Sequence, residues 1–236
     1  MKQEIRIFAT RHTRELAALY SDFICNALGI EDITSCHLCN YSERLKAGSD
    51  QFTPVHKAVY SEFDKGESSK LVSEYWKLAN AMAVELSVET DVLKWAFQRY
   101  PSLRVHYPGN VSVFEFHRDS DYNHPLGELN HFLALTNCTN TASLWLETNL
   151  GWGDISPLNL EQGQLARLNT SIWLHGDKIN LEGYTRVSID FRLVPLAVIE
   201  GEKVSSSITK NIKFNKHHYF KPASTINGLS VTRNAR

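Results

Sequence analysis

Residues 185–195 of this 236-residue chain read Thr-Arg-Val-Ser-Ile-Asp-Phe-Arg-Leu-Val-Pro, and their alternation decides the fold. Apolar side chains take every second position, and the positions between them hold Arg186, Ser188, Asp190 and Arg192. A period of two is typical of a β-strand whose two faces meet different surroundings. The polar face suits either solvent or the floor of a polar pocket. In a pocket, an Arg fork and a hydroxyl two residues away could together bind a carboxylate.

A second stretch, Glu115–Tyr122, places His117 and Asp119 two residues apart, after an expected strand over 111–116. Residues i and i+2 of an extended chain point to the same face, so an imidazole nitrogen and a carboxylate oxygen can converge. His175 lies far downstream, after an apolar run. Two histidines and one carboxylate form the ligand set of non-haem Fe(II) oxygenases. The alternative is a polar strand end with a solvated Asp119.

From about Leu103 to Pro195 the sequence resembles the Fe(II)/2-oxoglutarate-dependent dioxygenases. The matching pieces are Pro108-Gly109-Asn110, His117-Arg118-Asp119, the run His-Pro-Leu-Gly-Glu-Leu-Asn over 124–130, His175-Gly176 and Thr185-Arg186-Val187-Ser188. Arg186 follows His175 by eleven residues, and the family pattern places an Arg ten to eleven residues after the distal His. Within the superfamily the sequence most resembles the branch typified by streptomycin-biosynthesis hydroxylase-like proteins, which share the His-Arg-Asp-Ser-Asp-Tyr run and the strand over 143–147.

The resemblance implies an α+β chain with a double-stranded β-helix, or jelly roll, at its core. It implies that His117, Asp119 and His175 bind the catalytic Fe(II), and that Arg186 and Ser188 bind the far carboxylate of 2-oxoglutarate. The implied reaction consumes O2 and hydroxylates an unactivated C–H bond, with release of succinate and CO2. Halogenases of this type replace the metal carboxylate with a small residue, so the presence of Asp119 disfavours halogenation.

Several neighbours of these residues are candidates for binding a ligand, and each also has a structural interpretation. Asn130 could bind the cosubstrate or simply satisfy backbone groups. The candidates for substrate contact are Arg118, Asp121, Trp145, Glu147 and Arg192. Trp145 is equally consistent with ordinary core packing, and an Arg192–Asp190 ion pair is the favoured alternative for Arg192. The polar character of the set predicts a small polar substrate, such as an amino acid, a sugar or an aminocyclitol-like metabolite.

The hydrophobic pattern divides the chain into three expected parts. Residues 1–101 read as a helical region that packs on the core, with a helix stopped by Gly29, one started by Thr53-Pro54, one over 70–86 and a shorter one over 91–99. Residues 102–199 read as the jelly-roll core, and 200–236 as a C-terminal extension. Short strands are expected at 103–107, 111–116, 130–135, 143–147, 155–160, 164–168, 172–174 and 185–194.

Composition limits the remaining choices. A formal net charge of −1 and a pI near 6.8 give no electrostatic attraction to nucleic acid or to an anionic membrane. No apolar run reaches the ~20 residues that span a bilayer, and the first residues lack the apolar core of a signal peptide. Four cysteines are too few for a disulfide scaffold, which favours the cytoplasm. Buried thiols are favoured over a zinc site for Cys25, Cys36 and Cys39.

Two other classes of protein fit part of this pattern. One is a cupin-type, metal-independent sugar epimerase or isomerase, in which His and Tyr perform acid–base chemistry. The other is a non-catalytic ligand-binding jelly roll. The presence of all three ligand types together with Arg186 favours the oxygenase. The sequence leaves the prime substrate, the oxidised carbon and the oligomeric state open.

Overall fold

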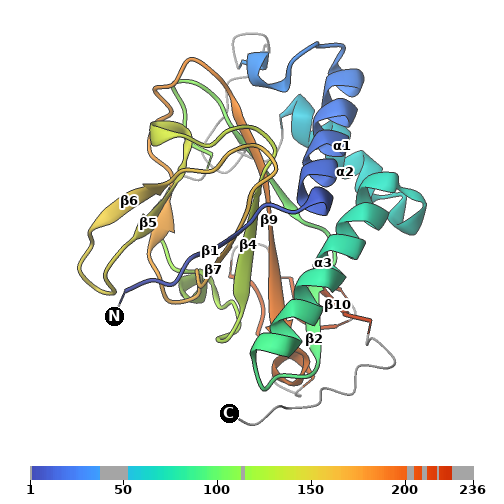
Figure 1. Cartoon of the computed structure of the whole chain (residues 1–236), viewed down its shortest axis with the longest axis vertical. Coiled ribbons are helices and arrows are strands. Elements are labelled where there is room, and N and C mark those ends of the chain that lie inside the picture. The colour runs from blue at the N-terminus through green and yellow to red at the C-terminus, as the bar shows by residue number, and fades with distance from the viewer. Residues whose placement is uncertain are drawn as a thin grey trace.

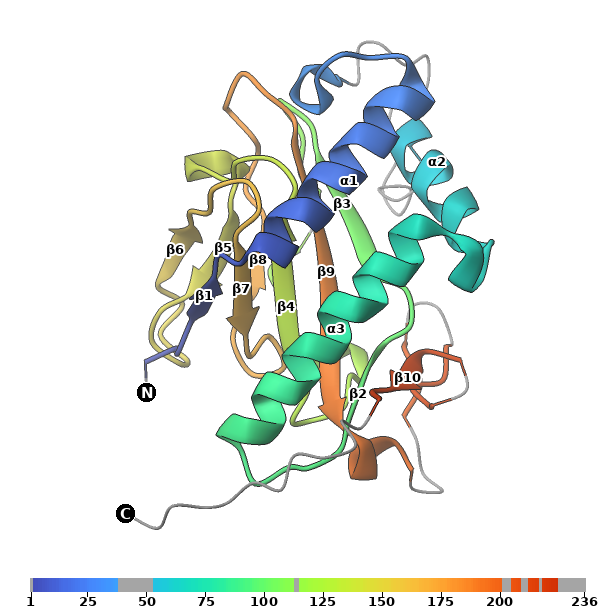
Figure 2. The ribbon, with the colours of Figure 1, turned by 45° about the vertical axis from the view of Figure 1, so that its right-hand side comes forward.

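A computed structural model describes residues 2–37, 53–112, 115–200, 205–208, 212–216 and 218–224. Two antiparallel sheets face each other, and helices cover the outer face of the larger one (Figures 1 and 2). The large sheet has the order β1-β7-β4-β9-β2-β10, with β3 also paired to β9. Its strands are β1 (Arg6–Phe8), β7 (Leu165–Leu168), β4 (Leu129–Ala134), β9 (Arg186–Pro195), β2 (Trp95–Gln98), β10 (Phe220–Pro222) and β3 (Ser102–His106). The small sheet has the order β6-β5-β8, formed by Ile155–Leu158, Leu144–Glu147 and His175–Gly176.

Strand β9 lies at the centre of the large sheet and is buried on both faces. Its alternation directs one set of side chains toward the helices, where they join the main hydrophobic core: Val187, Ile189, Phe191 and Leu193. The opposite set faces the space between the two sheets, and Arg186, Asp190 and Arg192 line a pocket there. The predicted period of two is confirmed, and the polar face is a pocket floor because the small sheet covers it.

Three helices form the outer layer: α1 (Arg11–Leu28), α2 (Pro54–Phe63) and α3 (Lys70–Glu89). Thr10, Thr53 and Ser69 cap their first turns through side-chain oxygens that accept backbone N–H bonds. Helix α1 ends at Gly29, whose φ of +65° favours glycine. Tyr20 and Tyr75 are fully buried with the apolar face of β9. None of the described helices combines the length and apolar character needed to cross a bilayer.

Three predicted elements are wrong or displaced. The helix expected over 91–99 is replaced by strand β2, whose four residues are all buried between β9 and β10. Val111 and Ser112 are not in a strand, while residues 113 and 114 lie outside the described residues. The strand expected over 172–174 is a turn, closed by a bond from Trp173 N to Asn169 O, and the strand begins at His175.

Segments from both ends of the chain contribute strands to the large sheet. β1 and β2 from the first hundred residues and β10 from the last forty pair with strands of the central region. Phe214 and Phe220 are buried against Ala96 and Val194, which fixes the described part of the C-terminal segment on the domain. The division at residues 101 and 199 remains a prediction, and the hydrogen bonding of the large sheet crosses both boundaries.

Candidate metal centre

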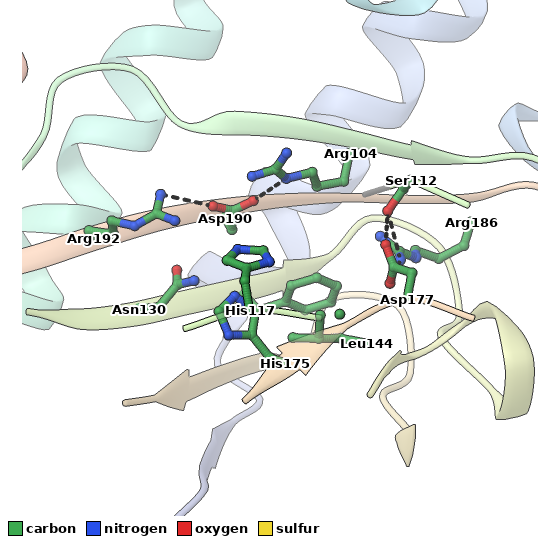
Figure 3. Close-up of a pocket in the computed structure, with 12 residues that line it drawn as sticks. Arg104, Ser112, His117, Asn130, Leu144, His175, Asp177, Arg186, Asp190 and Arg192 are labelled. Atoms are coloured by element: carbon green, nitrogen blue, oxygen red, sulfur yellow. Dashed lines mark hydrogen bonds and ion pairs between the residues drawn. The ribbon is translucent and has the colours of Figure 1, made fainter. Parts of the chain in front are cut away.

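The pocket between the sheets is small and strongly polar (Figure 3). Its enclosed volume is about 40 Å³, room for very few water molecules. It is lined by Arg104, Ser112, His117, Asn130, Phe132, Leu144, His175, Gly176, Asp177, Arg186, Asp190 and Arg192. Three arginines in one buried pocket need carboxylate partners, since an unpaired buried charge is costly.

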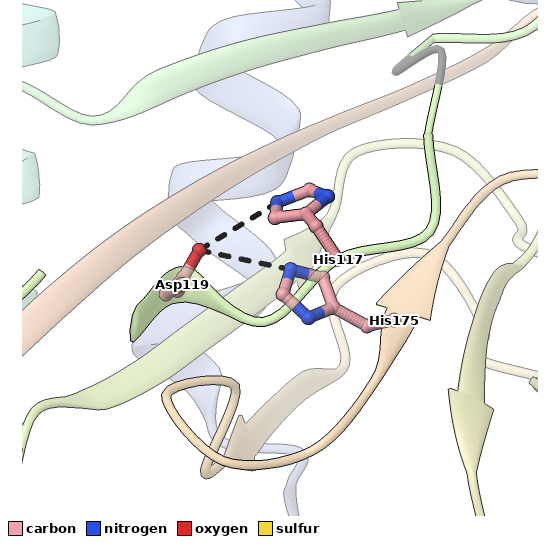
Figure 4. A group of neighbouring side chains, drawn as sticks. All are labelled: His117, Asp119 and His175. Atoms are coloured by element: carbon pink, nitrogen blue, oxygen red, sulfur yellow. Dashed lines mark ion pairs between the residues drawn. The ribbon is translucent and has the colours of Figure 1, made fainter. Parts of the chain in front are cut away.

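His117, Asp119 and His175 converge at one end of this pocket (Figure 4). One ligand atom from each lies within 4.8 Å of the others, and no other such group occurs among the described residues. Asp119 Oδ1 is 3.8 Å from His117 Nε2 and 3.7 Å from His175 Nε2. These separations suit three atoms around one ion, because ligand bonds of about 2.0–2.2 Å place neighbouring ligand atoms about 3 Å apart or slightly more.

Backbone pairing holds the two histidines together although they are far apart in the sequence. His117 and His175 form an antiparallel bridge, with N–H···O distances of 2.9 Å in both directions. Gly176 permits this approach, because a Cβ there would lie 3.0 Å from the Cα of Phe116. Asp119 begins a 3-10 helix, Asp119–Tyr122, and its N–H donates to Thr170 O at 2.9 Å.

The imidazole rings are oriented by their Nδ1 atoms. His117 Nδ1 lies 2.8 Å from Glu115 O, and His175 Nδ1 lies 3.1 Å from Trp173 O. A carbonyl oxygen can only accept, so each Nδ1 carries the proton and each Nε2 presents its lone pair toward Asp119. Burial lowers the pKa of His175, and it outweighs the opposite effect of the Asp119 charge. A neutral ring is the form that binds a metal ion.

Arg192 fixes the carboxylate of Asp119 from the other side. Its Nη2 donates to Asp119 Oδ1 and Oδ2, both at 3.2 Å, and Thr170 Oγ1 donates to Oδ2 at 2.6 Å. Burial alone would raise the pKa of Asp119, but the charge of Arg192, followed by those of His175 and His124, holds it far below its ordinary value. Asp119 is therefore an ionised ligand with a fixed orientation.

Arg192 also bonds to its predicted partner, Asp190, and to Glu128, which the sequence did not assign to it. Its Nε lies 2.8 Å from Glu128 Oε1, and Nη1 lies 3.2 Å from Asp190 Oδ1. Burial raises the pKa of Glu128, and His124 Nδ1 lies 3.0 Å from its carboxylate. The predicted Arg192–Asp190 pair is thus present within a larger network. His124 and Glu128 belong to the run over 124–130 that resembles the family, but no local signal gave them or Thr170 a role here. Glu128 contacts Arg192, His124 contacts Glu128, and Thr170 contacts Asp119, all through the tertiary structure.

Arg186 lies in a separate polar group in the same pocket (Figure 3). It is 1 % exposed, and its Nη1 donates to Ser188 Oγ at 2.9 Å, so the two residues predicted to bind a carboxylate lie side by side. Its Nη2 donates to Asp177 Oδ1 at 2.8 Å, and Ser112 Oγ donates to the other Asp177 oxygen. Burial, followed by the Arg186 charge, lowers the pKa of His106 to about 4, so His106 is a neutral partner. Asp177 was not predicted, and it places a carboxylate on Arg186.

Four predicted substrate residues do not line the pocket. Trp145 and Glu147 alternate with Leu144, which does line it, and so lie on the other face of β5. The Glu147 carboxylate accepts bonds from Gly153 N at 3.0 Å and Leu174 N at 3.4 Å. Arg118 donates from Nε to Ile172 O at 2.9 Å and from its backbone N to Asp121 at 2.8 Å.

The remaining candidates are placed as follows. Asn130 does line the pocket, and its Oδ1 has no hydrogen-bond partner within the described ranges. His131, the next residue along β4, is not a metal ligand, because its ring is buried and stacks on Phe191. Cys36 is buried and Cys25 is half-buried, whereas Cys39 lies outside the described residues.

Comparison with known proteins gives one sequence relative and several structural ones. The chain is 28% identical over 201 residues to the streptomycin biosynthesis protein StrG of Streptomyces griseus, covering 85% of this chain and 90% of StrG. No model of a known protein family matches the sequence.

Three solved structures are similar in fold at low sequence identity. SnoK, a non-heme alpha ketoglutarate dependent carbocyclase from nogalamycin biosynthesis, has a TM-score of 0.55 at 11% identity, covering 83% of this chain and 81% of SnoK. EctD from S. alaskensis in its apoform has a TM-score of 0.51 at 10% identity, with coverages of 92% and 82%. The nickel complex of the non-heme monooxygenase ThoJ has a TM-score of 0.50 at 13% identity, with coverages of 88% and 80%. The predicted fold is confirmed: the chain is α+β with a double-stranded β-helix core.

Proposed function

We propose that this protein is an Fe(II)/2-oxoglutarate-dependent oxygenase of the branch that includes StrG-like proteins. The observation that supports this most directly is the convergence of ligand atoms from His117, Asp119 and His175, which lie within 4.8 Å of one another. Two imidazoles and one carboxylate on one face leave the remaining positions of an octahedral ion open for reactants. StrG, the similar sequence, is named for streptomycin biosynthesis, which agrees with an enzyme that acts on a small metabolite.

The side chains present fit both the ion and the diacid. Nε2 of each histidine presents a lone pair, and Asp119 is held ionised by Arg192. The guanidinium of Arg186 already binds one carboxylate, that of Asp177, beside the hydroxyl of Ser188. A carboxylate of 2-oxoglutarate would take the place of Asp177, because the carboxylate of Asp177 already accepts the bond from Nη2 of Arg186.

Each residue then has a defined role. His117, Asp119 and His175 hold Fe(II), while Arg192 and Thr170 fix the orientation of Asp119. Arg186 and Ser188 bind the far carboxylate of the cosubstrate. When bound, Fe(II), 2-oxoglutarate and O2 supply oxidation of a C–H bond coupled to formation of succinate and CO2.

Hydroxylation of a small polar metabolite, such as an amino acid, a sugar or an aminocyclitol-like compound, is the reaction we propose. The pocket supports a polar ligand, because most of its lining side chains are charged or hydrogen-bonding. SnoK shares the fold and is described as a carbocyclase, so the fold is compatible with other outcomes of C–H oxidation. Asp119 occupies the ligand position that halogenases leave open.

The test is succinate release by the anaerobically reconstituted Fe(II) protein after addition of 2-oxoglutarate and air, without prime substrate. We expect slow release that requires iron and is abolished in His175→Ala, with 2-oxoglutarate still consumed by a Ser171→Ala control. A metal-independent isomerase would neither consume 2-oxoglutarate nor respond to chelation. A binding protein would bind 2-oxoglutarate in calorimetry without releasing succinate, even with candidate polar metabolites present.

A further inference from the structure

Among the three arginines of the pocket, Arg104 has terminal nitrogens without a protein partner. Its Nε donates to Asp190 Oδ2 at 2.7 Å. Within the described ranges, no hydrogen bond or ion pair reaches its Nη1 or Nη2. The side chain is 19% exposed and lines the pocket (Figure 3). An Arg presents five N–H donors in a planar fork, so the four N–H groups on Nη1 and Nη2 of Arg104 have no partner among the described residues.

Arg186 and Arg192 differ in this respect. Arg186 bonds to Asp177, Ser188 and Ala142 O, and it is almost fully enclosed. Arg192 is bonded through all three of its nitrogens to a set of carboxylates and polar oxygens: Asp119, Glu128, Asp190, Gln98 and Tyr219. Both guanidiniums are therefore occupied by protein groups, whereas the outer edge of Arg104 is available to a ligand.

The position of Arg104 separates it from the group around Arg186. Its backbone lies opposite Ser188 in the β3–β9 register, but its side chain extends along β9 to Asp190, away from Arg186. Asp190 is itself shared, because its second oxygen accepts from Arg192 at 3.2 Å. Because Asp190 is shared by two guanidiniums, its single negative charge does not neutralise both, and Nη1 and Nη2 of Arg104 can still donate to an anion.

Asn130 provides a second unpartnered group in the same pocket. Its side chain is 4% exposed, and its Oδ1 has no hydrogen-bond partner in the described part of the chain. Its backbone lies opposite Arg192 in the β4–β9 register, so it is near the metal end of the pocket. A buried amide oxygen without a donor costs free energy that a bound hydroxyl or amino group would recover.

We propose that the outer edge of Arg104 binds the carboxylate or phosphate group of an anionic prime substrate. This inference rests on the proposed function, because Arg186 and Ser188 are assigned to the cosubstrate. The substrate is then a small metabolite with an oxyanion at Arg104 and a hydroxyl or amino group near Asn130. A planar carboxylate or a phosphate can accept two parallel bonds from one guanidinium edge, which a neutral sugar or alcohol does less well.

The test measures anion binding to the Fe(II)-loaded, anaerobic protein saturated with 2-oxoglutarate. Inorganic phosphate and acetate are titrated separately by calorimetry at low ionic strength, so that the two probes distinguish a phosphate from a carboxylate ligand. Arg104→Gln removes the charge, and Arg104→Lys keeps the charge and the bond to Asp190 but loses the fork. Arg11→Gln, which removes an exposed positive charge on α1, is the matched control.

We expect at least one probe to bind the wild type, with affinity at least tenfold lower in Arg104→Gln and about three- to fivefold lower in Arg104→Lys. Arg11→Gln should bind as the wild type does. The affinity for 2-oxoglutarate should stay within twofold in both Arg104 variants. Arg104→Lys keeps the result interpretable should Arg104→Gln lose its fold, as judged by near-UV circular dichroism.

Three results overturn the inference: no binding of either probe to the wild type, equal binding to the Arg104 variants, or a tenfold loss of 2-oxoglutarate affinity in them. The last result would assign Arg104 to the cosubstrate. Failure of the proposed function has a different signature, since the wild type would then not bind 2-oxoglutarate at all. The same titrations without the diacid would still show whether anion binding depends on Arg104.

Discussion

The carboxylate of Asp177 accepts a hydrogen bond of 2.8 Å from Nη2 of Arg186, the residue proposed to bind the far carboxylate of 2-oxoglutarate. Both side chains are almost completely buried, with exposures of 1% for Arg186 and 2% for Asp177. The pair places Asp177 in direct competition with the diacid. Binding of 2-oxoglutarate should therefore exchange one carboxylate for another at Arg186, and the cost of displacing Asp177 lowers the affinity.

We predict that Asp177→Asn destabilises the ligand-free protein and raises the affinity for 2-oxoglutarate about tenfold. Removing one member of a buried ion pair leaves the other uncompensated, at a cost of roughly 3–5 kcal/mol. A carboxylate of 2-oxoglutarate would give Arg186 a negatively charged partner again. Thermal denaturation with and without 2-oxoglutarate, and calorimetric titration of the metal-loaded protein, measure both effects. Asp154→Asn, in a loop next to β6, is the control. A tenfold weaker affinity in Asp177→Asn would show that Asp177 assists binding instead.

Arg192 should be needed for tight metal binding although it is not a ligand. Its Nη2 bonds to both oxygens of Asp119, and residues that orient a metal ligand typically change affinity by about 10–100-fold. We expect Arg192→Gln to lower the Fe(II) affinity within this range, and Arg192→Lys to recover part of it. Competition with a chromophoric chelator under anaerobic conditions gives the affinities. If a folded Arg192→Gln protein bound Fe(II) with unchanged affinity, Arg192 would stabilise the fold without contributing to metal binding.

Gly176 should be intolerant of a side chain. A Cβ there would lie 3.0 Å from the Cα of Phe116 and 3.0 Å from its ring, so the bridge between His117 and His175 would open. We expect Gly176→Ala to lower metal affinity at least tenfold with a clear loss of stability. Gly183→Ala is a matched control, because nothing lies within 4 Å of the added methyl. Equal behaviour of the two variants in metal titration and thermal denaturation would contradict this account.

His131 should make the fold sensitive to acid. Burial, followed by the charge of Arg167, lowers its pKa from 6.5 to about 3. The unfolded chain therefore binds a proton that the folded chain excludes, so the free energy of unfolding contributed by this group falls as the pH drops below 6.5. Between pH 6.5 and 4.5 the loss is about 2–3 kcal/mol, at about 1.4 kcal/mol per unit.

We predict that His131→Phe, which keeps a ring stacked on Phe191, reduces this loss by that amount. Urea denaturation at pH 7 and pH 4.5 measures the difference for the wild type and the variant. His218→Phe, at an exposed position, is the control. The prediction is wrong if the free energy of unfolding depends on pH in the same way in His131→Phe and His218→Phe.

The local hydrophobic pattern of the sequence predicted some helices and strands correctly and others wrongly. The alternation over 185–195 predicted β9 and its two faces, because side-chain direction in a strand depends only on position parity. The helix expected over 91–99 is wrong, because the structure of this segment depends on partners that are distant in the sequence and not on its local pattern. A short apolar segment fits either period, and Trp95–Gln98 becomes a strand by pairing with Leu193–Pro195 and Phe220–Pro222, which are distant in the sequence.

The sequence by itself determined the types of the site residues: the His117–Asp119 pair, the distal His175, and Arg186 with Ser188 two residues later. The His117–Asp119 and Arg186–Ser188 spacings are local, and together with the order of the motifs along the chain they were enough to propose an ion and a diacid. Only the tertiary structure decided that the Asp177 carboxylate accepts a bond from Arg186 and that Arg192 orients Asp119. It also decided that Arg104 bonds to Asp190 through Nε alone among the described residues. A long, flexible guanidinium can reach many partners, and packing of the two sheets selects which carboxylate each one meets.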